Sequence, residues 1–270
     1  TVSLHLIMLA LGIGPGDEVI MPTLTYIATA NAVKYCGATP VFVDSEEGTF
    51  NMDPTKIEEK ITERTKAIMP VHLYGLSCDM DPIMEIADKY HLFVVEDAAE
   101  AHGAVYKGRK VGSMGIAASF SFFGNKVITC GEGGMVTTDD EELYKKMMLI
   151  KSQGVSPDKR YWHLITGYNY RMTNMQAAVG LGQLENVEWH IGERRRIADL
   201  YEKYLGNNKS VKLQKVPSDC ISVYWMNNVI LQPDVKKTRD QVMAEMEERN
   251  FEMRPVYYPK HIMPPYLHEN

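Results

Sequence analysis

Short apolar runs and helical patterns alternate along the first half of the chain. The runs that predict strands are EVIMP (18–22), PVFVD (40–44), KAIMPVH (66–72), LFVVED (92–97), ASFSFF (118–123) and GMVTT (134–138). Apolar positions at helical spacing fall between them, at 26–36, 53–61, 79–90 and 139–152. The pairs Asp53-Pro54 and Asp81-Pro82 are expected to supply the N-cap and the first-turn proline of two helices. This alternation predicts an α/β fold with a mostly parallel, buried sheet that helices cover on both faces.

The two ends of the chain differ from this pattern. The chain opens on a helical pattern, TVSLHLIMLA, which Gly12, Gly14 and Pro15 end. A complete chain would supply an N-cap before this helix, so we expect that upstream residues are missing. The chain stops at Asn270 without a closing element, and we expect it to be cut short there as well.

The last third of the chain predicts a second, smaller unit. A long helical stretch runs from about Thr173 to Leu205, and its charged cluster at 193–196 is expected to form a solvated face. After it, YWMNNVILQP (224–233) predicts a strand and 236–249 a charged helix. We therefore expect a large domain over 1–206 and a small α+β domain over 207–270.

Composition narrows the classes of function. The 270 residues carry 29 Lys and Arg against 35 Asp and Glu, a net charge of −6, which argues against a nucleic-acid binder. The four cysteines form no CxxC pair and the eight histidines are scattered, so we expect no metal site. Isolated thiols and the lack of an apolar run of roughly 20 residues favour a cytoplasmic protein without a membrane span.

Two segments carry candidate chemistry. In VVEDAAEAHGA (94–104) a buried strand leads into Asp97, where a buried carboxylate needs a cationic partner, although Asp97 could equally cap the following turn. In SFSFFGNKVITCGEGGMVTT (119–138), Lys126 lies between apolar runs and glycines. A lysine in such partly desolvated surroundings has a lowered pKa and becomes nucleophilic toward carbonyls.

A third segment, RYWHLITGYNYRMTNMQAA (160–178), is dense in aromatic and polar residues. Such a loop either lines a site or an interface, or fills a core.

In order along the chain, these motifs resemble the DegT/StrS family of pyridoxal-phosphate (PLP) sugar-nucleotide aminotransferases. The motifs that carry the resemblance are TVSLHLIMLALGIGPGDEVI, PTLTYIATANAVKYCGATPVFVD, RTKAIMPVHLYG, VVEDAAEAHGA, SFSFFGNKVITCGEGGMV, GYNYRMTNMQAA and FEMRPVYYPKH. They cover essentially the whole chain. The resemblance implies the fold type I architecture of aspartate aminotransferase.

The resemblance also implies roles for individual residues. Lys126 would hold PLP as a Schiff base and then carry the proton between the substrate Cα and the cofactor. Asp97 would pair with the pyridine nitrogen, which supplies the cation that this carboxylate needs. Tyr26 would stack on the ring, and Glu100 matches a polar residue near the 3′ oxygen of the cofactor.

For the phosphate, the resemblance implies hydroxyls from Thr1 and Ser121. Asn169 matches an asparagine that reaches the phosphate of the neighbouring subunit, so a homodimer with shared active sites is implied. The sugar-nucleotide side would be lined by His163, Arg254, Tyr257 and His261, for which packing and domain closure are the alternative roles.

The implied reaction transfers the amine of L-glutamate to a nucleotide-linked keto sugar. Within the family, SFFGNK, GEGG and RYWH with GYNYRMTN favour GDP-4-keto-6-deoxymannose, with a UDP- or dTDP-linked 4-keto or 3-keto sugar as the alternative. A non-catalytic PLP-fold regulator is a second alternative, and it predicts loss of Lys126 or Asp97, both of which are present.

Overall fold

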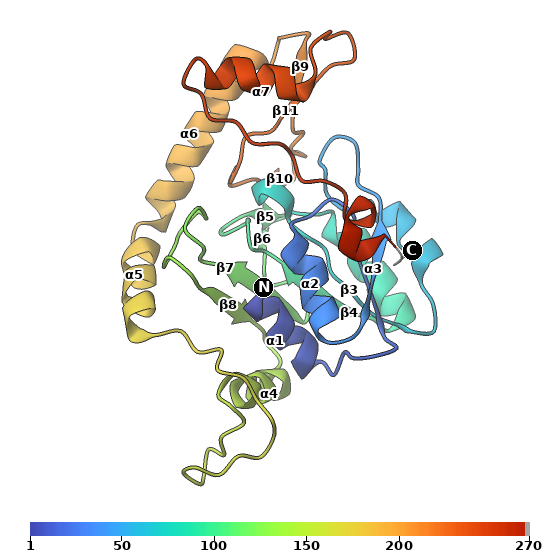
Figure 1. The fold of residues 1–270 in the computed structure, drawn as a ribbon, viewed down its shortest axis with the longest axis vertical. Helices are drawn as coiled ribbons and strands as arrows, with labels where there is room; N and C mark the ends of the chain where they lie inside the picture. Colours follow the sequence, from blue (N-terminus) through green and yellow to red (C-terminus); the bar gives the residue numbers. More distant parts are fainter. Residues whose placement is uncertain (268–270) are drawn as a thin grey trace.

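The computed structural model, which describes residues 1–267, is built on one six-stranded sheet (Figure 1). The strand order is β2-β1-β3-β4-β7-β8, and every neighbouring pair is parallel except β7 and β8. The strands are β1 Glu18–Pro22, β2 Thr39–Val43, β3 Thr65–Ile68, β4 Phe93–Asp97, β7 Ala117–Ser121 and β8 Gly134–Thr137. The predicted α/β class with a mostly parallel sheet is confirmed.

Helices cover both faces of this sheet. The helices are α1 Val2–Ala10, α2 Ile27–Tyr35, α3 Met80–Tyr90 and α4 Glu141–Lys151. Neighbouring side chains of a strand point to opposite faces, so Val19 and Met21 pack into a core with α1, α2 and α4, while Ile20 packs into a second core with α3. Burial on both faces explains why the strands are continuous apolar runs in the sequence.

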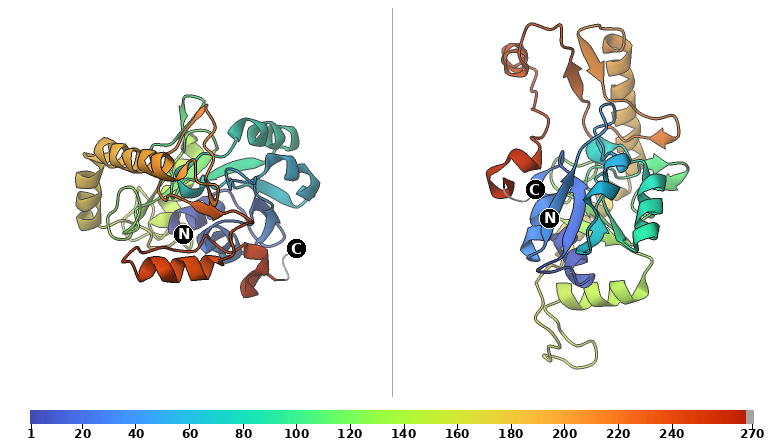
Figure 2. Two further views of the ribbon diagram at one scale, coloured as in Figure 1. Left: turned by 90° about the horizontal axis from the view of Figure 1, so that it is seen from above. Right: turned by 90° about the vertical axis from the view of Figure 1, so that its right-hand side faces the viewer.

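The remainder of the chain extends away from the sheet. Helices α5 Asn174–Leu184 and α6 Val187–Leu205 rise along one side, and β9 Val211–Leu213, β11 Val229–Leu231 and α7 Arg239–Glu247 lie at the far end of α6 (Figures 1 and 2). Strand β10 Cys220–Ile221 returns to pair with the small hairpin of β5 Val105–Tyr106 and β6 Arg109–Lys110. The domain boundary expected after residue 206 stays a prediction.

Two predicted helices in the first half differ from expectation. Residues 53–61 form two short 3-10 turns, Pro54–Lys56 and Glu58–Lys60, although Asp53 does cap the first by accepting the Thr55 amide at 2.9 Å. Helix α3 has Asp79 at its N-cap, so Asp81 and Pro82 lie inside its first turn. Proline is tolerated there because first-turn amides have no partner within the helix.

The long helix expected at 173–205 is interrupted at 185–186, where the Asn186 amide group donates to the Gly182 carbonyl at 2.9 Å. Within the expected solvated face, Arg194 and Arg195 instead donate to the carbonyls of Trp225 and Ser222, at 3.0 and 3.3 Å. These two guanidinium groups tie α6 to the segment that follows it.

The strand expected at 224–233 is reduced to Val229–Leu231, and the charged helix to Arg239–Glu247. Tyr224 has a φ of 47°, which no strand accommodates, and the Trp225 amide donates to the Tyr74 carbonyl at 3.0 Å. Contacts with a distant turn therefore override the local strand pattern.

Among the described residues, no helix has the length and apolar character needed to cross a membrane. Within residues 1–267, His, Cys, Asp and Glu side chains also form no group of three that could hold a metal ion.

Candidate active site

The ends of two neighbouring strands bring the candidate residues together. Strands β4 and β7 are parallel and adjacent, with Asp97 opposite Ser119. Asp97 ends β4, Glu100 follows it in the next turn, and Lys126 lies in the loop that follows β7. The carboxyl ends of parallel strands meet at one edge of a sheet, which is where α/β proteins hold ligands.

Asp97 is buried and receives its hydrogen bonds from neutral groups. Its Oδ2 accepts from the Thr29 hydroxyl at 2.7 Å, and Thr29 is itself 2.8 Å from the Thr25 hydroxyl. Its Oδ1 accepts from the amide of Ala99 at 3.2 Å, so Asp97 also caps the turn that follows the strand. A buried carboxylate with neutral partners suits a protonated ring nitrogen as its charge partner.

Lys126 is desolvated, as its apolar flanks predict. Its side chain is 11% exposed, and its Nζ lies 3.7 Å from Glu100 Oε1 and 3.9 Å from the ring centroid of Trp225. Burial lowers the pKa of Lys126, while the carboxylates of Glu100 and Asp97 act in the opposite direction. A lowered lysine pKa leaves more neutral amine, which is the form that attacks a carbonyl.

Glu100 is buried beside this amine. Its Oε2 accepts from the Tyr74 amide at 2.7 Å and its Oε1 from the Tyr257 hydroxyl at 2.9 Å. Burial raises the pKa of Glu100, and the positive charge of Lys126 and the Tyr74 amide limit that rise. Burial also raises the pKa of the Tyr257 hydroxyl, with the charge of Glu100 adding to the effect.

An aromatic row borders the cluster. Tyr26, Tyr257, Tyr74 and Trp225 follow one another with ring centroids 5.7, 5.6 and 6.4 Å apart, and the last two pairs are stacked. Tyr257 and Trp225 belong to the segment after residue 206, so that segment contributes two rings to the site around Lys126.

Three further predicted residues, Thr1, Ser121 and His261, have surroundings of their own. Thr1 is the N-cap of α1, and its side chain makes no capping hydrogen bond. Ser121 is the last residue of β7, and its Oγ accepts from the Phe123 amide at 3.3 Å. His261 bonds through Nδ1 to the Thr23 hydroxyl at 2.6 Å, and both line a cavity of about 250 Å³.

Three predicted residues are not brought to Lys126 within this chain. His163 and Asn169 belong to the loop between α4 and α5, which extends beyond α4 at the bottom of Figure 1. There His163 Nδ1 is 2.8 Å from the Gln153 carbonyl and Asn169 pairs with Ser152. Arg254 is exposed and forms an ion pair with Glu252 at 2.8 Å.

Trp225, Tyr74 and Thr29 are contacts that sequence reasoning missed. Trp225 was hidden inside an apparent strand, and Tyr74 inside the run that follows β3. Tyr74 has a φ of 58°, which needs a sharp turn. The adjacent Gly75 is the one signal in the sequence that points to this turn. Nothing in the residues around Thr29 indicates its bond to Asp97.

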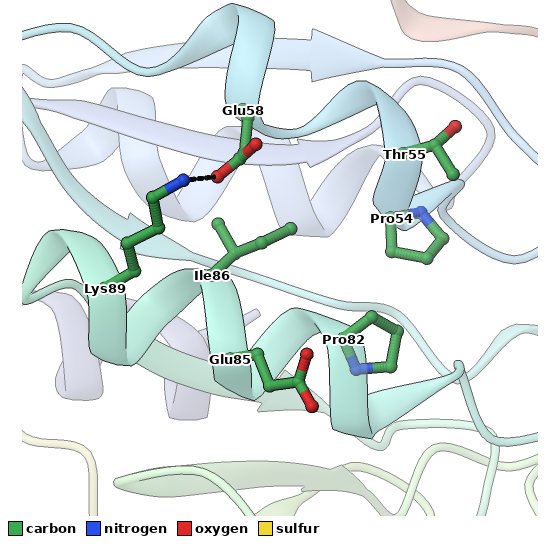
Figure 3. Close-up of a pocket in the computed structure, with 7 residues that line it drawn as sticks. All are labelled: Pro54, Thr55, Glu58, Pro82, Glu85, Ile86 and Lys89. Atoms are coloured by element: carbon green, nitrogen blue, oxygen red, sulfur yellow. Dashed lines mark hydrogen bonds and ion pairs between the residues drawn. The ribbon is translucent and has the colours of Figure 1, made fainter.

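A larger cavity, of about 380 Å³, lies elsewhere. It opens between the two 3-10 turns and α3, and Figure 3 shows the Glu58–Lys89 ion pair of 2.6 Å at one side. Its lining residues are Pro54, Thr55, Glu58, Pro82, Glu85, Ile86 and Lys89. None of them belongs to the cluster around Lys126, so this cavity is separate from the candidate site.

The residues of the cluster fit PLP. A desolvated lysine suits the aldehyde, a buried carboxylate suits the ring nitrogen, and the N-terminus of α1 with the Ser121 hydroxyl suits the phosphate. Together with the mostly parallel sheet, these features define a PLP-dependent aminotransferase of fold type I.

Comparison with known proteins gives the family. The model of the DegT/DnrJ/EryC1/StrS aminotransferase family matches residues 1–270, and the chain belongs to this family. It is therefore a PLP-dependent sugar aminotransferase, as the sequence motifs predict.

Individual relatives refine the picture. GDP-perosamine synthase of Caulobacter vibrioides is 56% identical over 269 residues, which are 99% of this chain and 72% of that protein. GDP-perosamine synthase of Escherichia coli O157:H7 is 52% identical over 266 residues, 98% of this chain and 72% of that protein. The dTDP-3-amino-3,6-dideoxy-alpha-D-galactopyranose transaminase of Aneurinibacillus thermoaerophilus is 43% identical over 258 residues, 95% of this chain and 69% of that protein.

Among solved structures, the PLP form of Spr1654 from Streptococcus pneumoniae aligns with a TM-score of 0.93 at 30% identity. The alignment covers 98% of this chain and 73% of that one.

Proposed function

We propose that this enzyme transfers the amino group of L-glutamate to GDP-4-keto-6-deoxymannose, the reaction of a GDP-perosamine synthase. The observation that carries the proposal is the 56% identity with the Caulobacter vibrioides GDP-perosamine synthase over 99% of this chain. The aligned region covers nearly all of this chain and so includes the strand ends, the Lys126 loop and the aromatic row, which in this proposal meet cofactor and substrate.

In this proposal Lys126 binds the cofactor and moves the proton. PLP, when bound, supplies the electron sink that makes the Cα–H of the amino donor acidic. Burial lowers the pKa of Lys126, which favours the neutral amine, the form of Nζ that can accept that proton. Asp97 would hold the ring nitrogen in its protonated form, and Glu100, which lies 3.7 Å from the Lys126 amine, would interact with the 3′ oxygen.

The remaining residues bind and orient. The hydroxyls of Thr1 and Ser121 and the free amides at the start of α1 favour the phosphate dianion. The exposed ring of Tyr26 is available to stack on the cofactor. Tyr257 and His261 would border the sugar nucleotide, together with His163 and Arg254 supplied by parts of the assembly outside this cluster.

We also propose a homodimer that shares its active sites. Helix α5 is apolar and none of its residues is buried, with Met175 82% exposed and Val179, Leu181 and Leu184 all more than half exposed. Such a face is unusual for a monomer and suits a second copy of the chain. In a dimer, Asn169 and His163 would be offered to the partner's site rather than to their own.

A dTDP- or UDP-linked keto sugar is the second candidate acceptor. It is favoured by the 43% identity with the dTDP-sugar transaminase. A cytoplasmic location is part of the proposal, supported by free thiols at Cys36, Cys78, Cys130 and Cys220.

The first test is visible absorbance of the purified protein with PLP, before and after L-glutamate. We expect a band of lysine-linked PLP that collapses when glutamate is added, and its loss in Lys126→Ala. Lys212→Ala, at an exposed lysine of β9, is the matched control. A normal band in Lys126→Ala would refute the role of this lysine.

The acceptor is tested by comparing kcat/KM for GDP-4-keto-6-deoxymannose with that for a dTDP-linked 4-keto sugar. A higher value for the GDP sugar supports the proposal, and a higher value for the dTDP sugar replaces it with the second candidate.

Sedimentation of wild type and Val179→Glu tests the dimer, because a charge on α5 should shift the protein toward monomer.

A further inference from the structure

Trp225 is the ring against which the Lys126 amine lies. The side chain of Trp225 is buried, and Nζ of Lys126 is 3.9 Å from its centroid, well inside the range for a cation–π contact. The same Nζ is 3.7 Å from Glu100 Oε1. The free amine of Lys126 is therefore held between a ring face and a carboxylate.

The indole is held firmly in this position. Its N–H donates to the carbonyl of Asn125, the residue directly before Lys126, at 2.7 Å. Its ring stacks on Tyr74 with planes 10° apart, and its backbone carbonyl accepts from Arg194 at 3.0 Å. A side chain that only filled space would not need contacts with both the lysine loop and a second ring, and the bond from Arg194 of α6 fixes its backbone as well.

The chemical consequence follows from the two charge states of lysine. If Lys126 carries the proton of the reaction, as the proposed function requires, it accepts that proton as a neutral amine and keeps it as an ammonium. An aromatic face attracts the ammonium and gives the neutral amine almost nothing. Trp225 therefore stabilises the lysine selectively in the state in which it has taken the proton.

We propose that Trp225 is a positioning residue for Lys126: its ring face, together with the Glu100 carboxylate, holds the lysine ammonium whenever that nitrogen is not bonded to the cofactor. The lysine, which carries the proton, therefore stays at the cluster from the moment it leaves the cofactor until it bonds to the cofactor again. The inference rests on the proposed function, because it takes Lys126 as the cofactor lysine.

The contact itself can be tested on cofactor-free protein with 13C-labelled lysine. The ε-methylene protons of Lys126, assigned with Lys126→Arg, are expected to resonate upfield of those of other lysines because of the indole ring current. Trp225→Leu should abolish this upfield shift and Trp225→Phe should keep part of it. Trp189→Leu, at an exposed indole of α6, is the matched control and should leave the signal in place.

The positioning role is tested on the PLP-loaded enzyme. We expect Trp225→Leu to slow the half-reaction with L-glutamate about 2- to 30-fold, which corresponds to about 0.5–2 kcal/mol at 1.36 kcal/mol per decade. PLP affinity should stay unchanged, and α-deuterated glutamate should show a larger isotope effect because proton transfer becomes slower. Trp225→Phe should recover most of the rate, since a benzene ring also binds cations.

An unshifted Lys126 signal in the wild type would overturn the inference, as would a shift that survives Trp225→Leu. An unchanged rate and isotope effect in a folded Trp225→Leu protein would also overturn it. If Trp225→Leu does not fold, the inference is tested on the wild type and Trp225→Phe. It is supported if Trp225→Phe keeps only part of the upfield shift and most of the rate, and overturned if the shift is the same in both proteins. Lysine-linked PLP in Lys126→Ala would refute the proposed function instead, while leaving the measured contact intact.

Discussion

Glu96, in strand β4, and Glu100, in the turn that follows it, lie four residues apart and are both buried, and their pKa values move in opposite directions. Burial alone would raise the pKa of Glu96, but the hydrogen bond from His72 and the amides of Gly115 and Gly112 bring it down to about 2. Burial raises the pKa of Glu100, which has weaker compensation.

The donors around the two carboxylates explain the difference. Glu96 accepts from the amides of Gly112, Met114 and Gly115 at 2.7–2.8 Å and from His72 Nε2 at 3.0 Å. His72 Nδ1 accepts from the Cys78 amide, which leaves the Nε2 proton for Glu96. Three of these four donors are backbone groups, which cannot leave without unfolding the chain locally.

Around Glu100, two of the three groups are side chains. The Tyr257 hydroxyl comes from the segment after residue 206, and in the proposed function the Lys126 amine moves during the reaction. Only the Tyr74 amide is backbone. A carboxylate bound by main-chain amides holds the fold together, whereas one bound by movable side chains can take part in chemistry.

The largest effect is expected from Glu96→Gln. It removes the charge that four donors converge on, and breaking such a buried arrangement costs about 3 kcal/mol or more in the free energy of unfolding. Urea denaturation at pH 7 measures this loss. Glu59→Gln, at an exposed carboxylate, is the control, and a loss below about 1 kcal/mol for Glu96→Gln would contradict the scaffold role.

The pH dependence sharpens the same point. The folded-state pKa of Glu96 lies below its ordinary value of 4.5, so its stabilisation is complete above pH 4.5 and is lost as the pH falls toward about 2. The shift corresponds to about 3 kcal/mol. We expect the stability gap between wild type and Glu96→Gln to close over this window in denaturation curves recorded at each pH. A stability difference between the two proteins that does not change with pH would contradict the lowered pKa of Glu96.

Glu100→Gln should affect chemistry more than stability. The variant keeps an acceptor for the Tyr74 amide, and it relieves a buried charge, so the free energy of unfolding at pH 7 should change by less than about 1 kcal/mol. Glu100 is also the main group that raises the pKa of Lys126, so that pKa should fall further. NMR titration of the labelled lysine measures it, and an unmoved Lys126 pKa would contradict the pairing.

The smallest effect is expected from Tyr257→Phe. The variant keeps the stacked ring and removes one hydrogen bond to Glu100, worth about 1 kcal/mol of net stability. Tyr258→Phe, which removes an exposed hydroxyl bonded to Arg239, is the matched control and should cost less. Urea denaturation measures the free energy of unfolding of both variants. Equal losses would show that burial of the Tyr257 hydroxyl adds nothing to the strength of its hydrogen bond.

Local patterns predicted the sheet well. Continuous apolar runs identify strands that are buried on both faces, and the structure has strands at all six predicted places. They failed at 53–61, where a weak pattern supports only 3-10 turns, and at Tyr224 and Trp225, where bonds to a turn 150 residues away replace strand pairing. Periodicity describes how a segment can be buried, and it contains no information on which distant group will bury it.

The apolar and helical patterns of the sequence by themselves determined the fold class, because they are local features. The resemblance of its motifs to a known family implied the cofactor and the neighbourhood of Asp97, Glu100 and Lys126. The tertiary structure alone decided that Glu96 supports the fold while Glu100 faces the lysine, and that Trp225 lies against Nζ. Adjacent carboxylates look alike in a sequence. Their roles depend on donors supplied by segments far along the chain, and the packing of those segments sets which donors arrive.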